Sequence, residues 1–118
     1  MSRDYSLYLN DILESCEKVG EYNSGLTFES FSVDGKTVDA VVRNLEIIGE
    51  AVKCVPKEML ASQPRIDWKR IARFRDIIAH YYFKVDLEVV WSITQEDLGP
   101  LTSAVSSILS EIKKDDTE

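Results

Sequence analysis

The spacing of apolar residues follows the period of an α-helix along most of the chain. From Tyr5 to Val19, apolar residues recur every three or four positions, which is the pattern of a helix with one buried face. The same spacing runs from Val38 to Val52, and Asp34 stands where an N-cap is expected. No segment alternates with the period of two that is typical of a strand. The first half of the chain therefore predicts two long helices.

The second half predicts shorter helices that are bounded by proline and aspartate. Pro56 suits the first turn of a short helix. Asp67 is the expected N-cap of a third helix, and Asp86 that of a fourth. Gly99–Pro100 is expected to kink or interrupt the fourth helix before the helical pattern resumes over residues 101–112. We predict an all-α fold, an up-and-down bundle of four to five helices with a Pro-kinked last helix.

Length and composition fit one globular domain. The chain has 118 residues, of which 44% are hydrophobic and 30% charged, a balance that supports an ordinary core. We predict a single helical domain over residues 1–114 and a frayed acidic tail over 115–118. The longest apolar runs have three residues, which excludes a transmembrane helix and a signal-peptide core. We therefore expect a cytoplasmic protein that does not bind membranes.

The few residues that could bind zinc do not form a ligand set. Cys16 and Cys54 stand singly on helical patterns, and His80 is the only histidine. The usual four-ligand Cys/His zinc sites cannot be built from these three residues. We predict no metal site and no cofactor.

The charge is distributed unevenly. The net charge of −7 argues against a general nucleic-acid coat protein. Residues 53–84, however, hold eight basic and three acidic residues, a net of +5, while the rest of the chain carries −12. Such a segment suggests a focused binding site for an anion. The alternative is a solvated helix face that pairs with acidic neighbours.

The predicted third helix, which begins at Trp68, carries an arginine within an apolar face. At 100° per residue, Arg75 lies in the middle of an arc formed by Trp68, Ile71, Ala72, Ile78 and Ala79. A charge in that position must be paired or must border a cavity. Glu46 and Glu50, four residues apart on the second helix, are possible partners, because two acids at that spacing repel unless a cation lies between them.

The same helix has a second apolar arc. Phe74, Ile77 and Tyr81 lie roughly opposite the first arc on the helical wheel. One bundle core does not easily cover both arcs, so the second arc suggests a surface for another copy of the chain. The alternative is that the fourth and fifth helices cover both.

Three side chains of this region could together cleave RNA. His80 can accept the proton of a ribose 2′-hydroxyl, because the pKa of histidine lies near working pH. Arg75 can hold phosphate oxygens and neutralise the charge that develops on them, and Tyr82 can donate a hydrogen bond. These groups suffice for cleavage without a metal. A simpler interpretation of His80 is a favourable charge near a helix C-terminus.

The stretch WKRIARFRDIIAHYYF, residues 68–83, resembles the HepT-like toxins of the HEPN superfamily. The signature of that family is Arg, four residues, His, one residue and Tyr, which are here Arg75, His80 and Tyr82. Asp76 occupies the polar position that commonly follows the arginine in HEPN ribonucleases.

The flanking segments resemble the same family in the expected order. RNLEIIGEA (residues 43–51) is similar to the family's second helix, VDLEVVW (85–91) to the helix after the motif, and DLGP (97–100) to its proline break. The resemblance covers nearly the whole chain, from about residue 5 to 112. It implies a HEPN-type bundle.

The resemblance also implies a function. It indicates the toxin of a prokaryotic toxin–antitoxin system: a metal-independent endoribonuclease that acts as a homodimer on an RNA substrate. The catalytic residues would be Arg75, His80 and Tyr82, with Asp76, Glu46 and Glu50 as accessory residues. The antitoxin would be a minimal nucleotidyltransferase of the MNT type, which transfers AMP to Tyr82. The basic residues Lys69, Arg70 and Arg73 of the same helix are predicted RNA contacts.

Two questions stay open at the level of sequence. On a straight helix Arg75 and His80 point about 140° apart, so the helix distorts near Ala79, the arginine reaches around, or the site combines residues from two subunits. The competing functions are a non-catalytic HEPN subunit that binds nucleotides or nucleic acid within a nucleotidyltransferase complex, and a purely structural dimeric bundle. The latter leaves Arg75 unexplained.

Overall fold

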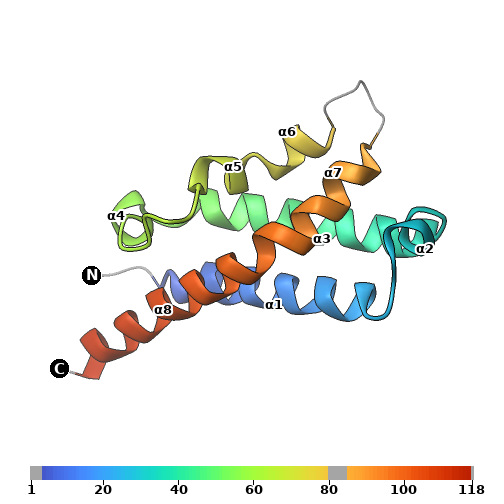
Figure 1. Ribbon diagram of the computed structural model, residues 1–118. Coiled ribbons are helices and arrows are strands. Elements are labelled where there is room, and N and C mark those ends of the chain that lie inside the picture. Colours follow the sequence, from blue (N-terminus) through green and yellow to red (C-terminus); the bar gives the residue numbers. More distant parts are fainter. Residues whose placement is uncertain (1–3, 80–84, 118) are drawn as a thin grey trace.

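The computed structural model describes residues 4–79 and 85–117, and all regular structure within these residues is helical (Figure 1). This confirms the all-α prediction. The elements are α1 (Ser6–Asn23), α2 (Phe28–Ser32), α3 (Gly35–Lys53), α4 (Lys57–Leu60), α5 (Trp68–Ala72), α6 (Phe74–Ile78), α7 (Leu87–Ser92), a π-helical segment η1 (Ile93–Asp97) and α8 (Leu98–Thr117). Among the described residues, no helix is both long and apolar enough to cross a lipid bilayer.

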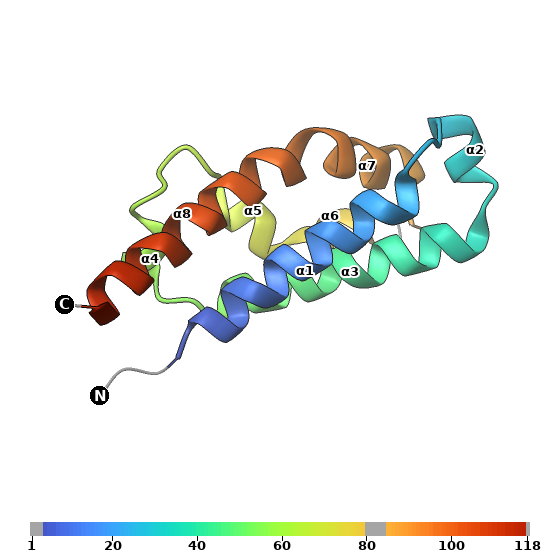
Figure 2. The ribbon, with the colours of Figure 1, turned by 90° about the horizontal axis from the view of Figure 1, so that it is seen from below.

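The elements form four rods that run up and down. The first two rods are α1 and α3, which lie antiparallel and side by side (Figures 1 and 2). The third rod consists of α5 and α6, which both pack on α3. The fourth rod consists of α7, η1 and α8, which packs on α1 through α8 and on α6 through α7. Because α3 touches both α1 and the α5–α6 rod, it is the central helix of the bundle.

Three aspartates begin helices where the sequence predicts them. Asp34 accepts hydrogen bonds from the backbone N–H and the hydroxyl of Thr37 at 3.1 and 2.7 Å. These bonds lower the pKa of the Asp34 carboxyl. Asp67 and Asp86 likewise accept from the backbone N–H three residues further on, at 3.1 and 3.3 Å. The N-caps of α3, α5 and α7 are therefore confirmed.

The last rod is interrupted as predicted, but the interruption comes before the proline. The chain is π-helical over Ile93–Asp97 and returns to α-helix at Leu98. Pro100 thus lies in the first turn of α8 and does not end the helix. A π-helical segment of this kind is a common cause of a bend in the helix that contains it.

The predicted third helix is broken at Arg73, whose backbone (φ −102°, ψ 16°) leaves the α-helical region between α5 and α6. The break changes the rotational phase of the residues after it. Phe74 is consequently fully buried in the core of its own chain, and Ile78 is buried one turn later. The expectation that Phe74 belongs to an intermolecular surface is therefore wrong, because this chain's own core covers it. Ile77 is half-buried against the same core.

The core is one continuous cluster that all four rods line. Its largest fully buried side chains come from every rod and from the short α2: Leu9, Ile12, Phe31, Leu45, Ile48, Phe74, Ile93 and Leu101. The ring of Phe31 packs on Trp91 of α7, with ring centroids 5.1 Å apart, and so ties α2 to the fourth rod.

The packing of α5 on α3 is close at Gly49. A Cβ atom at Gly49 would lie 3.2 Å from the carbonyl oxygen of Ile71 and 3.3 Å from that of Ala72. Both neighbours are backbone atoms, which cannot rotate away as a side chain can. The absence of a side chain at Gly49 therefore lets the end of α5 lie directly against α3.

Gly49→Val is expected to lower the free energy of unfolding by about 1–3 kcal/mol, the usual cost of overpacking a filled contact. The matched control is Gly20→Val in α1, where no atom lies within 4 Å of an added Cβ. It should change stability by about 0.5 kcal/mol or less, because glycine and valine differ little in helix propensity. Urea denaturation followed by circular dichroism measures both. Equal stability of the two variants would contradict the close contact.

Candidate functional site

Arg75 lies on the surface and not within an apolar face. Its side chain is 72% exposed on α6, because the break at Arg73 turns this position toward solvent. Its Nε atom lies 4.0 Å from Oε2 of Glu46 on α3. The expected pairing with Glu46 is thus present, at the outer limit of an ion pair and with both groups solvated. Such a pair holds the guanidinium only weakly and leaves it accessible to a phosphate.

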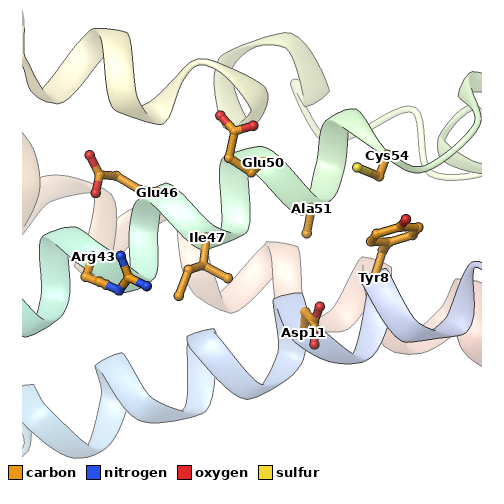
Figure 3. Close-up of a pocket in the computed structure, with 8 residues that line it drawn as sticks. All are labelled: Tyr8, Asp11, Arg43, Glu46, Ile47, Glu50, Ala51 and Cys54. Carbon is orange, nitrogen blue, oxygen red and sulfur yellow. The ribbon is translucent and has the colours of Figure 1, made fainter.

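The two predicted accessory acids of α3 have different partners. Glu50 accepts a hydrogen bond from Lys53 on its own helix, at 3.2 Å. Glu46 is the acid that faces Arg75. Figure 3 shows both carboxylates leaving α3 on the same side. Asp76, the third predicted accessory acid, is exposed in the first turn of α6, next to Arg75 in the chain.

His80 and Tyr82 lie outside the described residues, so their roles remain predictions. The flanks of their segment are described. The helix α6 ends at Ile78, and the backbone N–H of Asp86 donates to the carbonyl oxygen of Ile78 at 3.3 Å. A straight helix from Arg75 through residue 82 is therefore excluded. The angles of 140° between Arg75 and His80 and of about 20° between Arg75 and Tyr82, which assume such a helix, do not apply.

The three basic residues predicted to contact RNA are separated by the fold. Arg70 donates from Nε and Nη2 to Oδ2 of Asp97, at 3.2 and 3.1 Å, and so ties α5 to η1. Lys69 and Arg73 are exposed, the former on α5 and the latter at the break. The structure therefore engages Arg70 within the bundle and leaves Lys69 and Arg73 facing solvent.

A groove of about 320 Å³ lies between α1 and α3 (Figure 3). Ile47 and Ala51 contribute apolar surface, while Tyr8 and Asp11 face them from α1. Glu46 belongs both to this groove and to the pair with Arg75. Sequence reasoning did not identify the groove. The sequence does contain a signal for it: Arg43, Ile47 and Ala51 recur every four positions on α3, which is the spacing of a second helix face beside the buried one.

Comparison with known proteins identifies the class to which this fold and site belong. Residues 12–108 match the family described as "Ribonuclease HepT-like". The match covers most of the helical bundle and includes the whole segment from Arg75 to Tyr82. The chain therefore belongs to the HepT-like ribonuclease family, which confirms the resemblance found in the sequence.

Relatives of similar length support the same assignment. The chain is 44% identical over 101 residues to the "Probable ribonuclease HepT" of Thermococcus cleftensis, covering 86% of this chain and 92% of that protein. It is 41% identical over 106 residues to a "Putative RNase" of Caldanaerobacter subterraneus, covering 90% and 95%. A "Putative RNase" of Methanocaldococcus jannaschii is 35% identical over 114 residues, covering 97% and 94%. No solved structure matches the chain.

Proposed function

We propose that this protein is a metal-independent endoribonuclease whose catalytic residues are Arg75, His80 and Tyr82. The observation that carries the proposal is the complete Arg75–His80–Tyr82 motif in a chain of the HepT-like ribonuclease family, with the arginine exposed at the surface. An exposed guanidinium that pairs with Glu46 at 4.0 Å can exchange this partner for a substrate phosphate.

The proposed reaction is an internal transesterification, which releases the RNA fragment that carries the 5′-oxygen. The imidazole of His80 accepts the proton of the ribose 2′-hydroxyl, and the 2′-oxygen forms a bond to the adjacent phosphorus. The bond from phosphorus to the 5′-oxygen breaks, and that oxygen takes up a proton. Arg75 neutralises the charge that accumulates on the phosphate oxygens in the transition state. The products are a 2′,3′-cyclic phosphate and a 5′-hydroxyl.

Glu46 and Asp76 support the arginine in this proposal. Glu46 reaches Arg75 from α3 and limits the directions in which the long side chain can point. Asp76 adds a negative charge at the start of α6. Glu50, which binds Lys53, contributes to the charge of α3 and not to the arginine directly.

His80→Ala and Arg75→Ala should each reduce the cleavage of single-stranded RNA by about 100-fold or more, the usual loss for a general base or a charge-stabilising group. Cleavage should persist in EDTA and should leave cyclic phosphate termini. The measurement is cleavage of an end-labelled RNA with analysis of the termini. Arg65→Ala, which removes another exposed arginine, serves as the matched control and should remain active.

Two outcomes of this assay would contradict the proposal. Loss of activity in EDTA with recovery on adding magnesium would replace the internal transfer by metal catalysis. Full activity of His80→Ala would favour the alternative function, a non-catalytic HEPN subunit that binds nucleotides or nucleic acid in a nucleotidyltransferase complex.

We further propose that the enzyme is the toxin of a toxin–antitoxin system and that a nucleotidyltransferase of the MNT type neutralises it in the cytoplasm by transferring AMP to Tyr82. Each AMP adds a phosphodiester with about one negative charge to the motif that carries Arg75 and His80. That charge competes with RNA for the guanidinium. The proposal rests on the family resemblance and on the position of Tyr82 two residues after His80.

Incubation with the cognate nucleotidyltransferase and ATP should add AMP mass to Tyr82 and abolish RNA cleavage. Peptide mass spectrometry locates the adduct. Tyr82→Phe should escape modification, whereas Tyr81→Phe, the control one residue earlier, should be modified normally. An adduct on Tyr81, or full neutralisation of Tyr82→Phe, would mean that the antitoxin acts by occlusion.

We also propose a homodimer, in which RNA binds near the interface. The groove between α1 and α3 is an exposed surface whose lining includes Glu46, the residue that faces Arg75, and it takes the place of the Phe74 arc that was expected from the sequence. Sedimentation equilibrium at micromolar concentration should give twice the chain mass of 13.4 kDa. Ile47→Asp, within the groove, should shift the equilibrium to monomer. A wild-type chain that sediments as a stable monomer would contradict this proposal.

A further inference from the structure

A second cavity lies beside α5, at the start of the α5–α6 rod. Its walls come from the C-terminal end of α3, from α4 and from α5. Its volume is about 440 Å³, which is within the range of sites that bind small organic groups. The walls are largely apolar and include Val52, Val55 and Leu60, with Trp68 at the first position of α5. We call it the lysine cavity, because Lys53, Lys57 and Lys69 also line it.

The tryptophan offers the cavity an apolar ring. The indole N–H of Trp68 already donates to the carbonyl oxygen of Gln63, at 3.1 Å. This bond holds the ring in place and uses its only hydrogen-bond donor. The ring therefore contributes aromatic surface to the cavity. A flat aromatic group can stack on this surface.

The lysines give the cavity a positive rim. Lys53 is bound to Glu50, which offsets its charge. Lys57 and Lys69 are exposed, and neither makes an ion pair with any described residue within 4.0 Å. Because the chain as a whole is acidic, with a net charge of −7, two such ammonium groups beside an apolar cavity stand out as a site for an anion.

The lysine cavity is connected to the candidate catalytic residues by basic side chains. From Lys69 the rod passes exposed Arg73 at the break and reaches Arg75 on α6. Lys69 and Arg75 are six residues apart in the chain, on consecutive helices of the same rod, so an extended strand of several nucleotides can span both. A strand that passes Arg75 can therefore also reach the lysine cavity.

We propose that the lysine cavity is an RNA subsite, which takes one unpaired base of the substrate beside Trp68 while Lys57 and Lys69 hold the adjacent phosphates. This inference rests on the proposed ribonuclease function, to which it adds a preference for single-stranded RNA long enough to reach from Arg75 to the cavity. A base and its phosphates supply the aromatic surface and the negative charge that the cavity requires. An acidic peptide supplies the charge but lacks the flat base.

Tryptophan fluorescence tests base binding without depending on cleavage. The chain has two tryptophans, so Trp91→Phe leaves Trp68 as the single reporter. The probe is a 12-nucleotide single-stranded RNA of mixed sequence with 2′-O-methyl groups, which has no 2′-hydroxyl to react. We expect it to quench Trp68 fluorescence at saturation, and polyglutamate of equal charge to leave the emission unchanged. Equal quenching by both, or by neither, would overturn the proposal.

Charge reversal tests the role of the lysines. Lys57→Glu combined with Lys69→Glu should raise the Kd for the same RNA about tenfold or more at 0.15 M salt. It should also reduce the slope of log Kd against log salt by about 1.4, since each lost phosphate contact on a single strand removes about 0.7. Lys36→Glu, at the opposite end of α3 from Lys53, is the control for a surface lysine and should change Kd less than about twofold. Equal effects of the double variant and the control would overturn the proposal.

Cleavage assays separate this inference from the proposed function. The double lysine variant should raise KM for a 12-nucleotide RNA by a larger factor than KM for a dinucleotide, which is too short to place a base beside Trp68 and its phosphates on both lysines while bound at Arg75. Normal cleavage that depends on His80, without quenching of Trp68 and without an effect of the lysines, would reject the subsite alone. Quenching of Trp68 without cleavage of any RNA would reject the proposed function alone.

Discussion

The contact between α3 and α5 at Gly49 is the constraint on which the position of the site depends. The absence of a side chain there lets the carbonyl oxygens of Ile71 and Ala72 lie close to α3, 3.2 and 3.3 Å from where a Cβ would stand. This contact fixes the end of α5, and the following α6 then runs along the same helix. Glu46, one turn before Gly49, faces Arg75 as a result. The ion pair between Arg70 and Asp97 holds α5 from the other side, so the rod that carries the arginine is restrained by both α3 and η1.

The break at Arg73 allows this segment to bury its apolar residues and still expose Arg75. The segment must bury Phe74 and Ile78 and also present a charged guanidinium to a substrate. On one straight helix, Arg75 would lie in the middle of an apolar arc, where an unpaired charge is costly. Interrupting the helix one residue before Phe74 lets the aromatic ring enter the core and leaves Arg75 in solvent. The local loss of helical hydrogen bonds is small compared with the burial of a phenylalanine, which contributes about 1.5–3 kcal/mol.

The distribution of charge is consistent with an acidic ribonuclease that binds RNA at one place. Eight of the 14 basic residues lie within residues 53–84, which carry a net charge of +5, while the rest of the chain carries −12. Within that region the basic side chains have different environments. Arg70 pairs with Asp97 of η1, and Arg75 is exposed beside Glu46. Lys57 and Lys69 border an apolar cavity. A strand bound along this rod would contact one basic group after another, which is an arrangement suited to a flexible single-stranded RNA.

The sequence by itself determined what depends on local interactions and on short motifs. The caps Asp34, Asp67 and Asp86, the two long helices and the interruption of the last rod follow from residues close together in the chain. The spacing of Arg75, His80 and Tyr82 indicated the ribonuclease family in combination with the flanking segments. The break at Arg73 could not be predicted in this way, because every residue from Trp68 to Ile78 is compatible with an α-helix. Only the tertiary structure decided that Phe74 is buried in its own chain and that Arg70 binds Asp97, since burial and ion pairing are set by groups that are distant in sequence and meet only when the rods pack.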